Sequence, residues 1–228
     1  PLTPKEHTFL LRALIKMRLI CNALALHDKD IKPADREKTA PKLRELHHIL
    51  DEQIASNGHK AIVFSQWELM LDFVKPILER LDLGYVKLAG SVPTAKRGEI
   101  VDRFLNEPAC RVFLSTDAGG VGLNLQAADL VINLDLPWNP AVLEQRIARA
   151  HRHGQLNPVH VVNLIAQGTI EERMLDTLAA KRNVFGSVFG NEDSPSTISF
   201  RDSGQGLLRR LDQMLGAEIK PVVELEPV

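Results

Sequence analysis

The sequence contains little cysteine and no long apolar run. Only two of its 228 residues are cysteines, and Cys21 and Cys110 both lie in apolar surroundings. Two cysteines are too few for a disulfide framework, which indicates buried thiols in a reducing compartment. No stretch approaches the roughly 20 apolar residues of a membrane span, and no charged-then-apolar leader opens the sequence. We therefore expect a cytoplasmic protein with no membrane partner.

An excess of positive charge is also missing. Lys and Arg number 28 against 29 Asp and Glu, so the formal net charge is -1. Such a chain has no overall basic field with which to attract nucleic acid. Any contact with nucleic acid must therefore be local, and we expect it to be weak, sensitive to salt and independent of base sequence.

The elements that would let this chain hold ATP by itself are absent. ATP-driven work needs a phosphate cradle with a lysine, an acidic pair for magnesium and water, and positive charge at the γ-phosphate. The pattern G-x-x-x-x-G-K-[ST] does not occur, and neither does the G-x-S-x-G of a serine nucleophile. Asp51 and Glu52 resemble an acidic pair, but they lie in a helical pattern rather than at the end of a strand. The chain should therefore be inactive alone.

Short apolar runs alternate with helical patterns along the chain. The runs suit strands buried on both faces of a parallel sheet, and they cover residues 60–64, 85–88, 112–114, 130–134 and 159–164. Helical patterns cover residues 41–57, 67–81, 94 onward, 140–154 and 169–181. This alternation predicts an α/β fold, with a mainly parallel central sheet flanked by helices in three layers.

Both ends of the chain differ from this pattern. Thr3 and Glu6 form a capping box that begins a helix, whose apolar stripe should dock on another part of the protein; the stripe is Leu10, Leu14, Met17, Cys21 and Leu24. Residues 27–38 are charged and without an apolar face, so we expect a mobile loop. We divide the chain into a linking helix and charged loop (1–40), an α/β lobe (41–185) and a tail with one short helix (186–228).

The stretch from residue 111 to 155 contains most of the functional information. Three glycines lie within residues 119–122, directly after a strand, where open α/β sheets bind ligands. Asn139 and Pro140 should begin a helix that ends at Gly154, with Leu143, Ile147 and Ala150 as its buried stripe. Three arginines, at positions 146, 149 and 152, should fan out beside that stripe, although a solvated basic face is the alternative.

This stretch resembles the second RecA-like lobe of the Swi/Snf-type DNA translocases of helicase superfamily two. Residues 115–125 are similar to helicase motif V, residues 135–140 to the joining segment and residues 145–155 to motif VI. Residues 60–67 resemble motif IV, and residues 17–22 resemble the helix that links the two lobes. Arg146, Ala148 and His153 depart from the commonest eukaryotic form, so we expect bacterial-type relatives and, in a bacterium, association with the nucleoid.

The resemblance implies a role for individual residues. It makes Arg149 and Arg152 arginine fingers that reach ATP held mainly, with its Mg²⁺, by the other lobe. It places Gly122, Asn124 and Gln145 near the nucleotide. It implies contacts to the nucleic-acid backbone by Ser65, Gln66, Gly90, Ser91, Thr116 and Trp138. Two alternatives stay open: Ser65 caps the following helix, and Gly90-Ser91 is an ordinary turn.

The resulting hypothesis is one lobe of an ATP-driven motor. Its partners would be the first RecA-like lobe of the same, longer chain and the backbone of double-stranded DNA, and the protein would be monomeric. Two alternatives are a lobe of an RNA or DNA helicase and a nucleic-acid-binding module that hydrolyses nothing. We predict no metal site, because His151 and His153 would point apart on a helix and have no carboxylate or thiol beside them.

Overall fold

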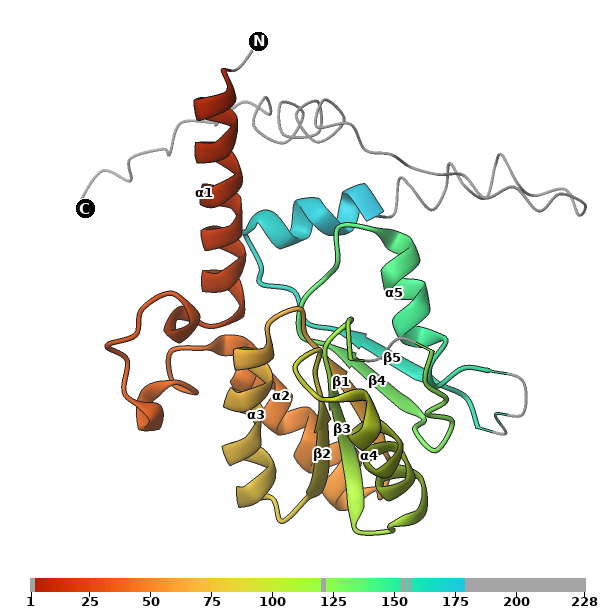
Figure 1. The fold of residues 1–228 in the computed structure, drawn as a ribbon. Coiled ribbons are helices and arrows are strands. Elements are labelled where there is room, and N and C mark those ends of the chain that lie inside the picture. Colours follow the sequence, from red (N-terminus) through yellow and green to blue (C-terminus); the bar gives the residue numbers. More distant parts are fainter. Residues whose placement is uncertain (1–2, 120–121, 153–154, 156, 179–228) are drawn as a thin grey trace, which may run out of the picture.

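A central sheet of five parallel strands organises the chain (Figure 1). The computed structural model describes residues 3–119, 122–152, 155 and 157–178. The strands lie in the order β2-β3-β1-β4-β5. Their bounds are Ala61–Phe64 (β1), Gly84–Leu88 (β2), Cys110–Ser115 (β3), Leu130–Asn133 (β4) and His160–Asn163 (β5). The predicted strands and the α/β fold class are confirmed.

Helices cover both faces of the sheet, which makes the three layers. The helices are α1 (Pro4–Asn22), α2 (Pro41–Ile49), α3 (Glu68–Arg80), α4 (Thr94–Asn106) and α5 (Pro140–Ile147). Helix α2 continues as π-helical turns over Leu50–Ser56, and residues 170–178 are also helical. One core cluster joins α2 and α3 to the sheet, while a second joins Phe104 of α4 to the other face. None of the described helices is long and apolar enough to cross a membrane.

Helix α1 extends away from the sheet (Figure 1). Thr3 accepts a hydrogen bond from the backbone of Glu6, whose side chain accepts one from the backbone of Thr3, so the capping box is confirmed. The predicted stripe is only partly right. Leu14 is buried together with Arg18, whereas Met17 is 41% exposed. The buried face is therefore shifted around the helix and contains a charged residue.

The charged segment between α1 and α2 contacts both α2 and α3, and its mobility stays a prediction. It contains two 3₁₀ turns, Leu24–Leu26 and Pro33–Asp35. The Arg36 guanidinium lies 4.5 Å from the ring centre of Phe73 in α3. Glu37 pairs with His47 of α2 and with Arg80 of α3. These contacts hold the segment against both helices.

Helix α5 is shorter than predicted. Asn139 caps it by accepting a hydrogen bond from the backbone of Ala141, as expected, but the helix ends at Ile147. Leu143 then packs with Leu136 and Met174, while Ala150 belongs to the cluster around Phe104. The prediction that Leu143, Ile147 and Ala150 form one buried stripe is therefore wrong. The predicted end at Gly154 and the predicted tail, 186–228, lie outside the described residues.

Candidate functional site at the strand ends

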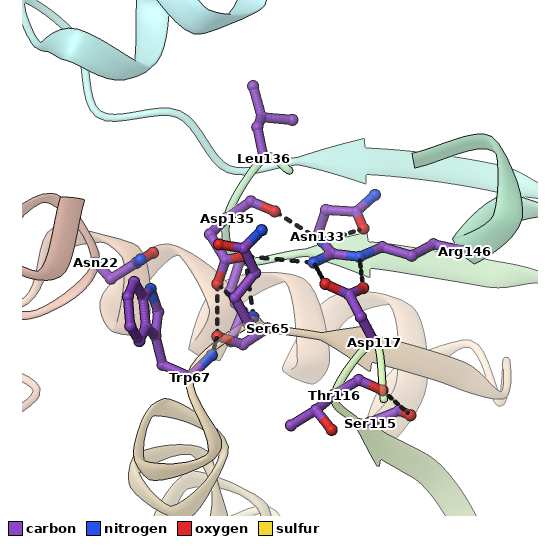
Figure 2. A network of polar contacts seen from close by, with 12 residues as sticks. Asn22, Ser65, Trp67, Ser115, Thr116, Asp117, Asn133, Asp135, Leu136 and Arg146 are labelled. Atoms are coloured by element: carbon purple, nitrogen blue, oxygen red, sulfur yellow. Dashed lines mark hydrogen bonds and ion pairs between the residues drawn. The ribbon is translucent and has the colours of Figure 1, made fainter. Parts of the chain in front are cut away.

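The candidate residues gather at one edge of the sheet because its strands are parallel. Gln66 follows β1, Ser91 follows β2, Thr116 follows β3, and the segment 135–138 follows β4. The carboxyl ends of parallel strands lie at the same edge, which is where open α/β sheets bind ligands. Figure 2 shows the side chains that meet there.

Arg146 of α5 lies at the centre of this edge (Figure 2). Its side chain is 2% exposed and donates a hydrogen bond to each carboxylate oxygen of Asp117, with nitrogen–oxygen distances of 2.6 and 3.0 Å. The same guanidinium donates to the Asn133 side chain at 3.1 Å and to the Asp135 carbonyl at 2.8 Å, and it lies 5.4 Å from the Phe64 ring centre. A planar fork with five donors suits such a set of acceptors. Arg146 was expected to fan out beside the buried stripe. Instead it joins the ends of β3 and β4 to α5.

Asp135 extends this network to the end of β1. Its carboxylate, which is fully buried, accepts a hydrogen bond from the Ser65 hydroxyl at 2.5 Å and bonds from the Gln66 backbone nitrogen at 3.0 and 3.1 Å. The Ser65 hydroxyl in turn accepts from the Trp67 backbone nitrogen. Helix α3 begins without a side-chain cap, so the interpretation of Ser65 as its cap is wrong. A DNA contact by Ser65 would have to remove this buried hydroxyl from Asp135, whereas Gln66 is partly exposed.

In the glycine-rich loop after β3, Gly119 packs against the end of β2, whereas Gly122 faces solvent. A side-chain carbon on Gly119 would lie 2.2 Å from the Leu88 carbonyl oxygen, so only glycine fits there. Gly122 has φ +76° and is exposed. The Thr116 hydroxyl accepts a hydrogen bond from the Gly119 backbone nitrogen, and Thr116 is 7% exposed. At Gly119 the close neighbour is the end of β2 and not the ligand that the sequence suggested.

The two predicted fingers lie on an irregular segment after α5. Arg149 is half-buried and Arg152 is exposed, and neither guanidinium makes a hydrogen bond or ion pair with any other residue that the structure describes. The backbone beneath them is held firmly: the Arg149 carbonyl accepts from the Leu125 nitrogen at 3.0 Å. The Gln155 amide donates to three carbonyls, those of Gln126, Ala128 and Ala150. This segment therefore presents two arginines from a fixed backbone.

Helix α1 is attached to the segment that follows β4. Arg18 is 4% exposed, donates to the Leu136 carbonyl at 2.6 Å, and lies 5.1 Å from the ring centre of Trp138. Burial lowers the pKa of Arg18, and the Asp135 carboxylate opposes this shift. Trp138 is half-buried between α1 and the apolar cluster around Leu136. Trp138, which was predicted to contact DNA, thus also packs against the linking helix α1.

A second buried ion pair lies nearby. The Lys42 ammonium of α2 lies 2.7 Å from the Glu171 carboxylate, and both side chains are almost fully buried. Lys42 also donates to the Asn22 side chain and to the Leu134 carbonyl. Burial lowers the pKa of Lys42, and the Glu171 carboxylate opposes the shift. This pair joins α1, α2, the end of β4 and the helix at 170–178.

Ser91 lies in an exposed network at the other side of the edge. Its hydroxyl donates to both carboxylate oxygens of Glu68, at 3.0 and 3.2 Å. The Lys87 ammonium lies 3.0 Å from Glu68 and 2.8 Å from Asp72. Gly90 is exposed beside Ala118 of the glycine-rich loop.

The remaining predicted residues, Asn124 and Gln145, are exposed and do not contact the Arg146 network. Sequence reasoning missed Asp117, Asn133 and Asp135 as parts of the site. Asn133 is the last residue of β4, and Asp117 and Asp135 lie two positions after the ends of β3 and β4, so their closeness to the ends of buried strands was the available indication. In the part of the chain that the structure describes, no group of His, Cys, Asp or Glu could hold a metal ion.

A parallel RecA-like sheet with an arginine-bearing segment at its carboxyl edge, in a sequence without a phosphate loop, defines a second lobe of a helicase-like ATPase. Residues 41–154 match the helicase conserved C-terminal domain, and the chain belongs to this family.

The relatives include a DNA repair protein, a nuclear protein and chromatin-remodelling ATPases. The chain is 35% identical to the DNA repair and recombination protein RAD54-like of Drosophila virilis, covering 79% of this chain and 23% of that protein. It is 36% identical to the nuclear protein STH1/NPS1 of Saccharomyces cerevisiae, covering 87% and 15%. The chain therefore spans less than a quarter of either relative. The Sulfolobus solfataricus SWI2/SNF2 ATPase core in complex with dsDNA is similar in structure, with a TM-score of 0.69 and 30% identity over 85% of this chain and 40% of that one.

These relatives correct two expectations. Both sequence relatives are eukaryotic, which does not support a bacterial-type protein. One of them is named a nuclear protein, and others are chromatin-remodelling ATPases, so the expectation of a cytoplasmic or nucleoid location is wrong.

Proposed function

We propose that this lobe is part of an ATP-dependent translocase on double-stranded DNA, and that Arg149 and Arg152 act on ATP bound by the first lobe. One observation carries the proposal. The two guanidiniums have no partner among the described residues, and hydrogen bonds from Leu125 and Gln155 hold the backbone that bears them. Arginines that are free of other partners and fixed in position can stabilise the negative charge that develops on a transferring phosphoryl group.

We also propose roles for the remaining predicted residues. Gly122, Asn124 and Gln145 are exposed around the finger segment and are proposed to line the nucleotide side of the lobe. The DNA side is proposed to consist of Gln66, Gly90, Ser91, Thr116 and Trp138. Ser65 belongs to this side through the Asp135 carboxylate, which it shares with the Gln66 backbone. Contacts to the phosphate backbone carry no sequence information, which suits a motor that moves along any sequence.

ATP and Mg²⁺ would be held mainly by the first lobe, because this chain has no phosphate loop. When bound, they supply the phosphoryl group and the metal charge. The residues of this chain contribute donors: each guanidinium can fork onto two phosphate oxygens. The complex of the Sulfolobus relative with double-stranded DNA supports duplex DNA as the partner.

Replacing Arg149 or Arg152 by Ala in the full-length protein tests this function. We expect DNA-stimulated ATP turnover to fall by roughly 10³- to 10⁵-fold with little change in ATP affinity, because a finger acts on the transition state. Lys should rescue poorly, since an ammonium lacks the planar fork. The measurements are single-turnover hydrolysis at saturating ATP and DNA and a separate ATP-binding titration.

The matched control is Arg12→Ala, an exposed arginine on α1 away from the strand ends, which should leave turnover unchanged. If the Arg149 and Arg152 variants lose ATP affinity but keep their turnover at saturation, the arginines are binding groups and the proposal is wrong.

A further inference from the structure

Ser91, a candidate contact for a DNA phosphate, already has an anionic partner in this protein. Both oxygens of the Glu68 carboxylate accept from its hydroxyl, at 3.0 and 3.2 Å. Glu68 lies in the first turn of α3, while Ser91 lies in the turn between β2 and α4. The contact therefore spans two separate segments of the strand-end edge.

The same carboxylate also holds a cation. The Lys87 ammonium, near the end of β2, lies 3.0 Å from Glu68 and 2.8 Å from Asp72. A serine hydroxyl and an ammonium are the kinds of donor that bind a phosphate oxygen. Glu68 thus occupies two donors that a DNA phosphate could use together.

This contact is open to solvent. The Glu68 side chain is 41% exposed, Ser91 is exposed, and Lys87 is 18% exposed. The hydrogen bond from Lys87 lowers the pKa of Glu68, so the carboxylate is ionised at neutral pH and repels an approaching phosphate. An ion pair whose carboxylate is this open to solvent is weak, so phosphate can displace it.

We propose that Ser91 and Lys87 form a phosphate-binding pair for the DNA backbone, and that Glu68 occupies this pair until DNA displaces it. Glu68 then weakens DNA binding by competing for the donors, while Asp72 keeps Lys87 near the edge after Glu68 has left. The inference rests on the proposed function, since it assumes that this edge meets duplex DNA.

The test is Glu68→Gln in the full-length protein, titrated with a fluorescently labelled, mixed-sequence DNA duplex at several salt concentrations. The amide keeps the size of the side chain but loses the ion pair with Lys87. We expect DNA affinity to rise about two- to fivefold at low salt, the size of one exposed ion pair. The slope of log K against log salt should become steeper by about 0.9, because Lys87 then neutralises one more phosphate.

The matched control is Glu79→Gln, which makes the same change of charge in α3 but at the far end, where Glu79 accepts from the Tyr85 hydroxyl. It should leave affinity and slope unchanged. Adding Lys87→Met to Glu68→Gln should remove the gain in affinity and the added slope.

Each other outcome counts against the proposal in a distinct way. If the wild type binds DNA and Glu68→Gln binds it equally, only the inference about Glu68 fails. An equal gain in Glu79→Gln would show a general charge effect and overturn the inference as well. If neither the wild type nor the variants bind duplex DNA, the proposed function fails and this inference fails with it.

Discussion

Two networks at the same edge of the sheet contain the same kinds of side chain, but one is buried and the other is exposed to solvent. In the buried triad, the Ser65 hydroxyl donates to Asp135, whose carboxylate also lies 3.4 Å from the Arg146 guanidinium. In the exposed triad, the Ser91 hydroxyl donates to Glu68, which pairs with Lys87. Each triad is one serine, one carboxylate and one cation. The carboxylate is fully buried in the first and 41% exposed in the second.

Burial decides what each triad can do. The buried triad joins the ends of β1 and β4 to α5, and its Asp135 carboxylate is fully buried. Breaking a buried ion pair leaves an uncompensated charge, whereas water replaces either partner of an exposed pair. We infer that the buried triad fixes the geometry of the edge, and that the exposed triad can exchange its carboxylate for a phosphate.

The largest difference between the triads should appear when the cation is removed. We expect Arg146→Met to lower the free energy of unfolding by about 3–5 kcal/mol, because Asp135 and Asp117 then lose their shared partner. The measurement is urea denaturation of the purified protein. Lys should restore little, since one ammonium cannot reach the acceptors on Asp117, Asn133 and Asp135 together.

The matched control is Arg152→Met, an exposed arginine a few residues further along, which should change the unfolding free energy by at most about 0.5 kcal/mol. Similar losses in both variants would mean that the Arg146 contacts do not organise the edge.

The serines provide a second and smaller contrast. Ser65→Ala should cost about 1–3 kcal/mol, because it leaves the buried Asp135 carboxylate without one of its donors. Ser91→Ala should cost at most about 0.5 kcal/mol, because water can hydrogen-bond to Glu68 in its place. Urea denaturation of both variants under one set of conditions makes the comparison, and equal costs would contradict the role assigned to burial.

The sequence predicted the sheet but not the contacts that hold the site together. Short apolar runs identified the strands, and Asn139 with Pro140 identified the beginning of α5. Arg146, however, pairs with Asp117, 29 positions earlier, and with the Asp135 carbonyl, 11 positions earlier. Periodicity describes neighbours on one element and gives no information about such partners. The arginine repeat therefore suggested a fan of three similar side chains, although one of them is buried.

Tertiary contacts also ended α5 earlier than its pattern indicated. No glycine or proline interrupts residues 141–153, so the helical pattern continues past Ile147. In the structure the Arg149 carbonyl accepts from Leu125, and Gln155 binds the Ala150 carbonyl. The first bond comes from a distant loop and the second from the same segment, and both occupy carbonyls that a continuing helix would use. Likewise, the stripe on α1 was placed by hydropathy alone, which cannot foresee the buried Arg18.

The smallest expected effect is the dependence of the exposed triad on pH. The hydrogen bond from Lys87 lowers the pKa of Glu68 below its ordinary value of 4.5. Burial alone would raise the pKa of Asp72, but hydrogen bonds from Lys75 and Lys87 lower it. A carboxyl whose pKa is lower in the folded state stabilises the fold above the pKa of the unfolded chain. That contribution is lost as the pH falls through the folded value.

Lys87→Met should therefore lower the unfolding free energy slightly at neutral pH, by less than about 1 kcal/mol, because Glu68 and Asp72 both lose a cation. The difference from the wild type should shrink as the pH falls below about 4.5 and the carboxylates take up protons in both proteins. Urea denaturation at a series of pH values, with Lys96→Met on α4 as an exposed control, makes the measurement. A difference that stays constant down to low pH would mean that Lys87 acts through its packing and not through its charge, and the contrast between the two triads would then lose its electrostatic basis.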